Sequence, residues 1–196
     1  MTQLSVKTIE EAVYKKYQNS KRLNHILGVA RLAKELAVKF NIDSEKAYIA
    51  GLLHDYIKYE PVSQMLEIIN DQEIIEKFKN APQIYHAYAS SVVAKKEFMI
   101  DDEDILDAIK YHVYGRLNMT LLEKILVVSD FAEDSREYAR CKEVRKILDN
   151  GDFDRALCLS IEYTIEAVLA KGDQPMNEQY QILEQLKLLG GCHYEK

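Results

Sequence analysis

The chain has 196 residues, of which 47% are hydrophobic, and a formal net charge of −6 at pH 7. This length suits one domain spanning 1–196, and no apolar run approaches the eighteen or so residues that a membrane span needs. The negative charge disfavours sequence-independent binding to nucleic acid or anionic lipid. We therefore expect a soluble protein with no nucleic-acid or membrane partner, although a small anionic substrate could occupy a local cationic pocket.

The N-terminus and the cysteines indicate the cellular context. Residues 1–5 lead straight into a polar amphipathic segment and lack the features of a secretory signal, so we expect a cytoplasmic protein. The cysteines, Cys141, Cys158 and Cys192, are odd in number, far apart and in no Cys-x-x-Cys spacing. They indicate neither a disulfide framework nor a thiolate zinc site, so any metal must use nitrogen and oxygen ligands.

Apolar positions recur mostly at three- and four-residue steps, and only three prolines and seven glycines interrupt them. This spacing predicts an all-α fold without strands. We expect helices over 6–18, 20–40, 44–56, 62–79 (broken near Asp71), 83–98, 102–113, 120–131, 141–149, 153–171 and 175–189. Thr120 and Glu123 have the spacing of a capping box, Pro61 and Pro175 suit first helical turns, and Gly172 suits a helix exit.

Four of the five histidines occupy positions that the helical period turns toward the interior. His25 shares a face with Val29 and Leu36, and His112 shares one with Ile109. His86 lies on the same face as Ala89 and Val93 by the same reasoning. The fifth, His193, stands close to the C-terminus, and we assign it no role.

Two carboxylates accompany these histidines. His54 and Asp55 stand side by side at the end of an apolar helical stretch, where this pair is better suited to holding a metal ion than to building a core. Asp130 ends the run Ile125-Leu126-Val127-Val128-Ser129, one helical turn past Leu126, which points its carboxylate at the core.

A single inward histidine is more often a hydrogen-bonded core residue than a ligand. Four imidazoles and two carboxylates together would each carry a desolvation cost of about 1–3 kcal/mol if unsatisfied, which a shared cation offsets. Nitrogen and oxygen ligands without sulfur suit iron, manganese, cobalt or zinc, and we favour iron or manganese. Either one ion takes His25, His54, Asp55 and Asp130, or a second ion uses His86 and His112, with Asp55 bridging ions roughly 3.5–4 Å apart.

The ordered set His25, His54-Asp55, His86, His112 and Asp130 resembles the HD-domain superfamily of metal-dependent phosphohydrolases over about residues 20–137. Within it, the chain is similar to the YqeK family. The segments that carry this likeness are Gly51-Leu52-Leu53-His54-Asp55-Tyr56-Ile57-Lys58, His86-Ala87-Tyr88, Tyr111-His112-Val113-Tyr114-Gly115-Arg116 and Leu122-Glu123-Lys124-Ile125.

The resemblance implies an HD-domain helical bundle with short additional helices, those over about 141–190 packing on the metal-site core. It also implies symmetrical hydrolysis of diadenosine tetraphosphate to two ADP, with iron at the HD site and manganese or cobalt as substitutes. Carried over by position, the metal ligands are His25, His54, Asp55 and Asp130. The phosphate contacts are His86, His112 and Arg136, and the nucleotide is bordered by Gln174, Pro175, Met176 and Asn177.

Catalysis on a polyphosphate requires a positioned nucleophile and positive charge around the transferring phosphoryl group. Metal-bound hydroxide would be the nucleophile, with Asp55 or Asp130 accepting hydrogen bonds from that water. Lys58, three residues after Asp55, can bring an ammonium to the phosphates, whereas its alternative role is a solvated surface lysine. Arg22, Arg116 and Arg136 are further candidates for phosphate contacts.

The sequence leaves three rival functions open. The first is hydrolysis of another nucleotide, such as a guanosine polyphosphate, a deoxynucleotide or a cyclic dinucleotide, by the same chemistry. The second is a non-haem iron oxygenase, which the cationic residues argue against. The third is a nucleotide sensor that binds without turnover. The sequence also leaves open base identity, the number of ions and the oligomeric state, a homodimer included.

Overall fold

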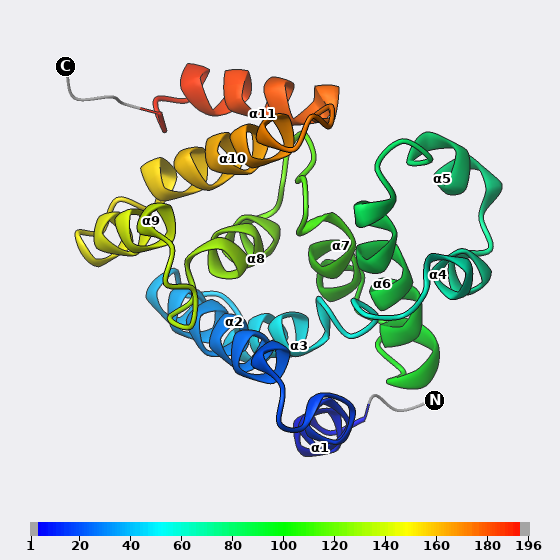
Figure 1. The fold of residues 1–196 in the computed structure, drawn as a ribbon. Coiled ribbons are helices and arrows are strands. Elements are labelled where there is room, and N and C mark those ends of the chain that lie inside the picture. The colour runs from blue at the N-terminus through cyan, green and yellow to red at the C-terminus, as the bar shows by residue number, and fades with distance from the viewer. Residues whose placement is uncertain (1–3, 193–196) are drawn as a thin grey trace.

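The computed structural model describes residues 4–192, and helices make up its regular structure with no strand in that range (Figure 1). The all-α prediction is therefore confirmed. The helices are α1 (Val6–Tyr17), α2 (Lys21–Lys39), α3 (Ser44–Leu53), α4 (Val62–Ile69), α5 (Gln72–Lys77), the short 3₁₀ helix η1 (Pro82–Ile84), α6 (Tyr85–Glu97), α7 (Glu103–Tyr111), α8 (Leu121–Ala132), α9 (Ala139–Asp149), α10 (Phe153–Ala170) and α11 (Asn177–Leu188). His193 lies outside the described residues.

The helix ends follow the local signals in most places. The break near Asp71 is confirmed, because Asn70 ends α4 in the left-handed conformation at φ 45° and Asp71 caps α5. Thr120 and Glu123 form the capping box of α8. The prediction for Pro175 is wrong, because α11 begins only at Asn177.

The helix predicted over 44–56 ends early, at Leu53, and this shift matters for the site. Residues 54–60 form successive turns instead, in which the Lys58 amide donates to the Asp55 carbonyl at 2.9 Å. The Tyr17 hydroxyl reaches from α1 to the Asp55 carbonyl at 3.0 Å, and the Ser90 hydroxyl on α6 accepts the Ile57 amide at 3.1 Å. These tertiary hydrogen bonds replace those of a continued helix.

Five helices, α2, α3, α6, α7 and α8, surround the interior where the predicted ligands lie. α2 packs on α3 and α8, and α3 and α8 both pack on α7 (Figure 1). α6 covers α7, and α4 packs on α6. At the upper side of the view in Figure 1, α10 lies on α8 and carries α11. None of the helices in this described range has the length and hydrophobicity that a bilayer crossing requires.

The contact between α2 and α3 depends on Gly51. A Cβ added at this glycine would lie 2.5 Å from the Ala30 Cα and 2.9 Å from the Ala30 amide nitrogen, so the backbone of α2 leaves no room for a methyl group. We expect Gly51→Ala to destabilise the fold by about 1–3 kcal/mol, because the helices must separate. Denaturant unfolding measures this effect. Glu45→Ala, at an exposed position on α3, should move the midpoint little, and equal midpoints for both variants would contradict the prediction.

Two of the three cysteines form a disulfide that the sequence pattern did not predict. Cys158 on α10 and Cys192 beyond α11 form a disulfide with their Cα atoms 5.7 Å apart, although their spacing gave no indication of one. The reason is tertiary, since α10 and α11 pack against each other and bring residues 34 positions apart into contact. Cys141 is a free, buried thiol that packs as a small apolar residue.

Candidate metal centre and active site

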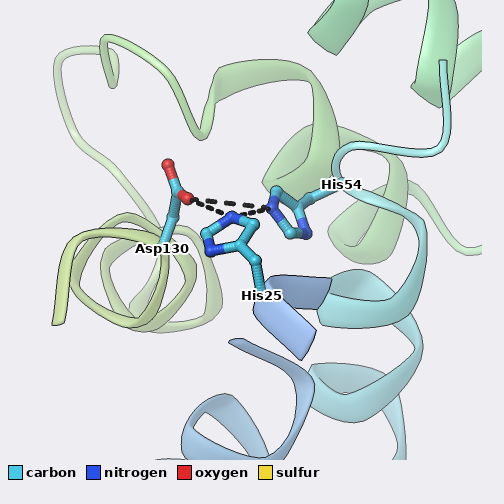
Figure 2. Close-up of side chains that lie close together, drawn as sticks. All are labelled: His25, His54 and Asp130. Carbon is cyan, nitrogen blue, oxygen red and sulfur yellow. Dashed lines mark hydrogen bonds and ion pairs between the residues drawn. The ribbon is translucent and has the colours of Figure 1, made fainter. Parts of the chain in front are cut away.

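Four predicted ligands from three parts of the chain converge on one point. His25 extends from α2, Asp130 from α8, and His54 and Asp55 from the end of α3, as Figure 2 shows for the first three. The Nε2 atoms of His25 and His54 are 3.3 Å apart. One oxygen of Asp130 lies 3.0 and 3.7 Å from these nitrogens, and Oδ2 of Asp55 lies 3.6 and 3.4 Å from them. Ligands bound at about 2.0–2.2 Å to one ion are spaced in this way.

The second nitrogen of each imidazole identifies its tautomer. Nδ1 of His54, His86 and His112 donates to the carbonyls of Gly51, Gln83 and Ile109 at 2.7, 2.6 and 2.7 Å. Nδ1 of His25 donates to a carboxylate oxygen of Glu133 at 3.0 Å. All four Nε2 atoms therefore present lone pairs to the centre of the cluster, which is the arrangement of metal-ligating histidines.

The other face of Asp55 meets the remaining histidines. Its Oδ1 atom lies 3.0 Å from Nε2 of His86 and 3.7 Å from Nε2 of His112, and those two nitrogens are 3.3 Å apart. Although Oδ1 is buried and close to these rings, it has no hydrogen-bond partner of acceptable geometry among the described residues. Asp55 thus separates two pairs of histidines, and a cation on either side would satisfy its oxygens.

The protonation states also fit a cation. Burial opposes ionisation of Asp130, but Arg136 and His25 hold the pKa of its carboxyl well below the usual range. Burial lowers the pKa of the His112 imidazole to about 3, with His54 and His86 adding to this effect, and burial also lowers the pKa of His86. An ionised carboxylate and the neutral imidazoles of His86 and His112 are forms that bind metal. At His25 burial opposes the charged form, but hydrogen bonds with Asp130 and Glu133 raise the pKa of its imidazole, so a metal ion there would displace a proton. The residues present therefore fit a divalent metal ion.

Glu133 orients His25 and was missed in the sequence. Its carboxylate accepts from His25 and from the backbone amide and hydroxyl of Ser135, the last two at 2.7 and 2.6 Å. Gly28 gives it room, because a Cβ there would lie 2.2 Å from the Glu133 carboxylate. The available signal was its position three residues after Asp130, at the same end of the same helical face.

We expect Glu133→Ala to weaken metal binding about 10–100-fold, because His25 loses the acceptor that fixes its ring and tautomer. Competition with a chromophoric chelator measures the affinity. Glu133→Gln keeps an acceptor oxygen and should lose less. Glu137→Ala removes an exposed carboxylate from the same loop and serves as the control. Metal affinities that do not distinguish Glu133→Ala from this control would refute the role.

Three of the four predicted cations lie at the cluster. Arg22 pairs with Asp55, Lys58 has its Nζ 3.0 Å from Nε2 of His86, and Arg136 donates to Asp130 at 2.8 Å. Arg116 lies elsewhere. It donates to the buried Glu123 at 2.7 Å and pairs with Asp107 at 3.1 Å. Through these two ion pairs Arg116 links Asp107 on α7 to Glu123 on α8. A contact between Arg116 and phosphate stays a prediction.

A pocket of about 320 Å³ opens beside the cluster. Lys58, His112, Asp130 and Arg136 line its inner end, and α10 supplies an outer wall that includes Tyr163 and Lys171. The predicted nucleotide-bordering residues Gln174, Pro175, Met176 and Asn177 lie in and just after the connection from α10 to α11, and none of them lines this pocket. Gln179 on α11 lines the pocket instead, and the sequence analysis did not predict this residue.

Known proteins resemble the chain in sequence and in fold. A family model described as HD domain matches residues 22–150. A Bacillus subtilis protein named bis(5′-nucleosyl)-tetraphosphatase, symmetrical, is 39% identical over 84% of this chain and 88% of its own length. A Staphylococcus aureus protein of the same name is 34% identical over 70% of this chain and 72% of its own length.

Among solved structures, a Clostridium acetobutylicum protein described as a predicted HD superfamily hydrolase involved in NAD metabolism matches with a TM-score of 0.84. It is 36% identical, and the match covers 96% of this chain and 100% of that one.

Proposed function

The chain belongs to the HD-domain family, and on this premise we propose that it is a metal-dependent phosphohydrolase that cleaves diadenosine tetraphosphate symmetrically into two ADP. The convergence of four histidine Nε2 atoms on the carboxylates of Asp55 and Asp130 supports the metal chemistry most directly. The names of the relatives from Bacillus subtilis and Staphylococcus aureus support the substrate and the symmetrical cut.

Iron is the metal that we propose, held by His25, His54, Asp55 and Asp130. His86 and His112, on the Oδ1 side of Asp55, would hold a second ion or contact the phosphates. When bound, a divalent ion supplies positive charge to the phosphates and lowers the pKa of water in the site toward neutrality. Manganese or cobalt would suit the same nitrogen and oxygen ligands.

The protein's own groups position the reactants. The carboxylates of Asp55 and Asp130 stay ionised and can accept hydrogen bonds from the attacking water. Lys58 and Arg136 enter the pocket from opposite sides of the cluster, so their charges can balance the negative charge that develops on the phosphoryl oxygens. Arg22 adds a third cation on the His25 side.

The pocket beside the cluster suits one nucleoside of the substrate. Phe131 on α8 and Tyr163 on α10 supply aromatic surface for a base. Gln179 is buried in the pocket wall, where its Oε1 accepts from the Met176 amide and its amide nitrogen can donate hydrogen bonds. The segment Gln174, Pro175, Met176 and Asn177 leads into the helix that carries Gln179 and would border the nucleotide from there.

Elemental analysis of protein purified without chelator, followed by chromatography of the products from diadenosine tetraphosphate, tests the proposal. We expect bound iron and ADP as the sole nucleotide product. Products consisting of ATP plus AMP would contradict the symmetrical cut. Full metal occupancy with tight nucleotide binding and no turnover would identify a sensor instead, and preferred hydrolysis of another nucleotide in a substrate panel would change the substrate.

A further inference from the structure

A second pocket, of about 240 Å³, opens on the other side of the metal cluster. His25 lines it, whereas His112 and Asp130 line the first pocket. Arg136 lines both, so this residue forms a wall that the two pockets share. The reactive centre thus lies between two cavities and not at the end of one.

The second pocket combines positive charge with aromatic surface. Lys21 and Arg22 at the start of α2 add two cations to that of Arg136. Glu133, the one carboxylate in this lining, is buried and already accepts hydrogen bonds from His25 and Ser135. Arg22 and Arg136 also pair with carboxylates, Asp55 and Asp130, but these two lie outside the lining, so the lining itself carries three cations and one carboxylate.

Two exposed tyrosines border this cationic pocket. Tyr59 and Tyr138 are 66% and 75% exposed. Tyr59 lies in the turn after Lys58, and Tyr138 immediately precedes α9. The Arg22 guanidinium lies over the Tyr59 ring, 5.3 Å from its centroid, which holds this ring at the mouth. Exposed aromatic rings beside guanidinium groups are suited to stacking on nucleobases.

We propose that the second pocket binds the other nucleoside diphosphate half of the substrate, with Tyr59 and Tyr138 contacting its base. This inference rests on the proposed function. A symmetrical cut leaves two phosphates and one nucleoside on each side of the broken bond, so a centre flanked by two cation-lined pockets matches the substrate on both sides. Tyr59 and Tyr138 determine specificity for a substrate with two nucleosides, and Arg136 contacts phosphate from the shared wall.

The test compares diadenosine tetraphosphate with adenosine 5′-tetraphosphate, which has the same number of phosphates and only one nucleoside. We expect the double variant Tyr59→Ala/Tyr138→Ala to raise KM for the dinucleotide about tenfold, the range of one lost stacking contact. KM for the mononucleotide should stay within about twofold, because its single nucleoside uses the first pocket. The double variant Tyr59→Phe/Tyr138→Phe keeps both rings and should behave like wild type. Tyr14→Ala, at an exposed tyrosine on α1, is the matched control.

A binding measurement provides a readout independent of turnover. Calorimetry with a diadenosine tetraphosphate analogue whose central bridging oxygen is replaced by methylene should show the same tenfold loss in the double alanine variant. An equal rise of KM for both substrates, or unchanged affinity for the analogue, would overturn the second subsite. If wild-type protein hydrolyses neither substrate, the proposed function fails instead, so the two failures can be distinguished.

Discussion

Asp55→Ala should abolish metal binding and activity together. Oδ2 of Asp55 faces His25 and His54, and Oδ1 faces His86 and His112, so the substitution removes the one carboxylate that both histidine pairs share. The imidazoles would still present their lone pairs, and Asp130 would still lie beside His25 and His54, but no carboxylate would join the two histidine pairs around a cation. We expect metal content near zero and a loss in kcat/KM of about 10³-fold or more.

Metal analysis and steady-state kinetics on the same preparation measure the effect of Asp55→Ala, with circular dichroism to confirm that the variant is folded. Asp134→Ala is the matched control. The Asp134 side chain is 95% exposed, and it lies 4.0 Å from Arg145, which is not one of the predicted metal ligands. The control should keep both metal and turnover. Activity in a metal-free Asp55→Ala protein would refute the central role of the ion.

Lys58→Ala should keep the metal and slow turnover at least about tenfold. The ammonium lies 3.6 Å from Oδ1 of Asp55 and 3.0 Å from Nε2 of His86, and it lines the pocket beside the cluster. It is close enough to reach phosphates there, but an ammonium has no lone pair with which to bind a cation. The loss should therefore appear mainly in kcat, because the charge that Lys58 balances grows in the transition state.

Lys58→Arg tests whether charge alone suffices at this position. Arginine keeps the positive charge in a planar group of different reach, so partial recovery of kcat is expected. Lys95→Ala, at an exposed lysine on α6, should leave kcat and metal content unchanged. Loss of metal from Lys58→Ala, or a kcat equal to wild type, would show that Lys58 does not act on the phosphates.

Local patterns in the sequence were sufficient for the helices and for the types of ligand. Helical spacing repeats every few residues, so it can be read without knowing any tertiary contact, as the break at Asn70 and Asp71 and the capping box of Thr120 illustrate. The same spacing turned His25, His86 and His112 inward, and all three are buried. The order of these residues along the chain also carried the resemblance to the HD-domain family.

The sequence reading failed where distant contacts compete with local preference. The helix after Ser44 stops at Leu53 because Tyr17 and Ser90 bind the backbone of the following turns. Cys158 and Cys192 meet only because two C-terminal helices pack together.

Periodicity and residue chemistry are properties of short segments, so the order of amino acids alone was enough to predict helices and nitrogen and oxygen ligands for a metal ion. Three features became visible only in the folded chain: Asp55 lies between two pairs of histidines, Glu133 orients His25, and Arg136 lines two pockets. His25 and Glu133, for example, are 108 positions apart in the sequence. The distances among these residues are set by the packing of α2, α3, α6, α7 and α8, which no local pattern specifies.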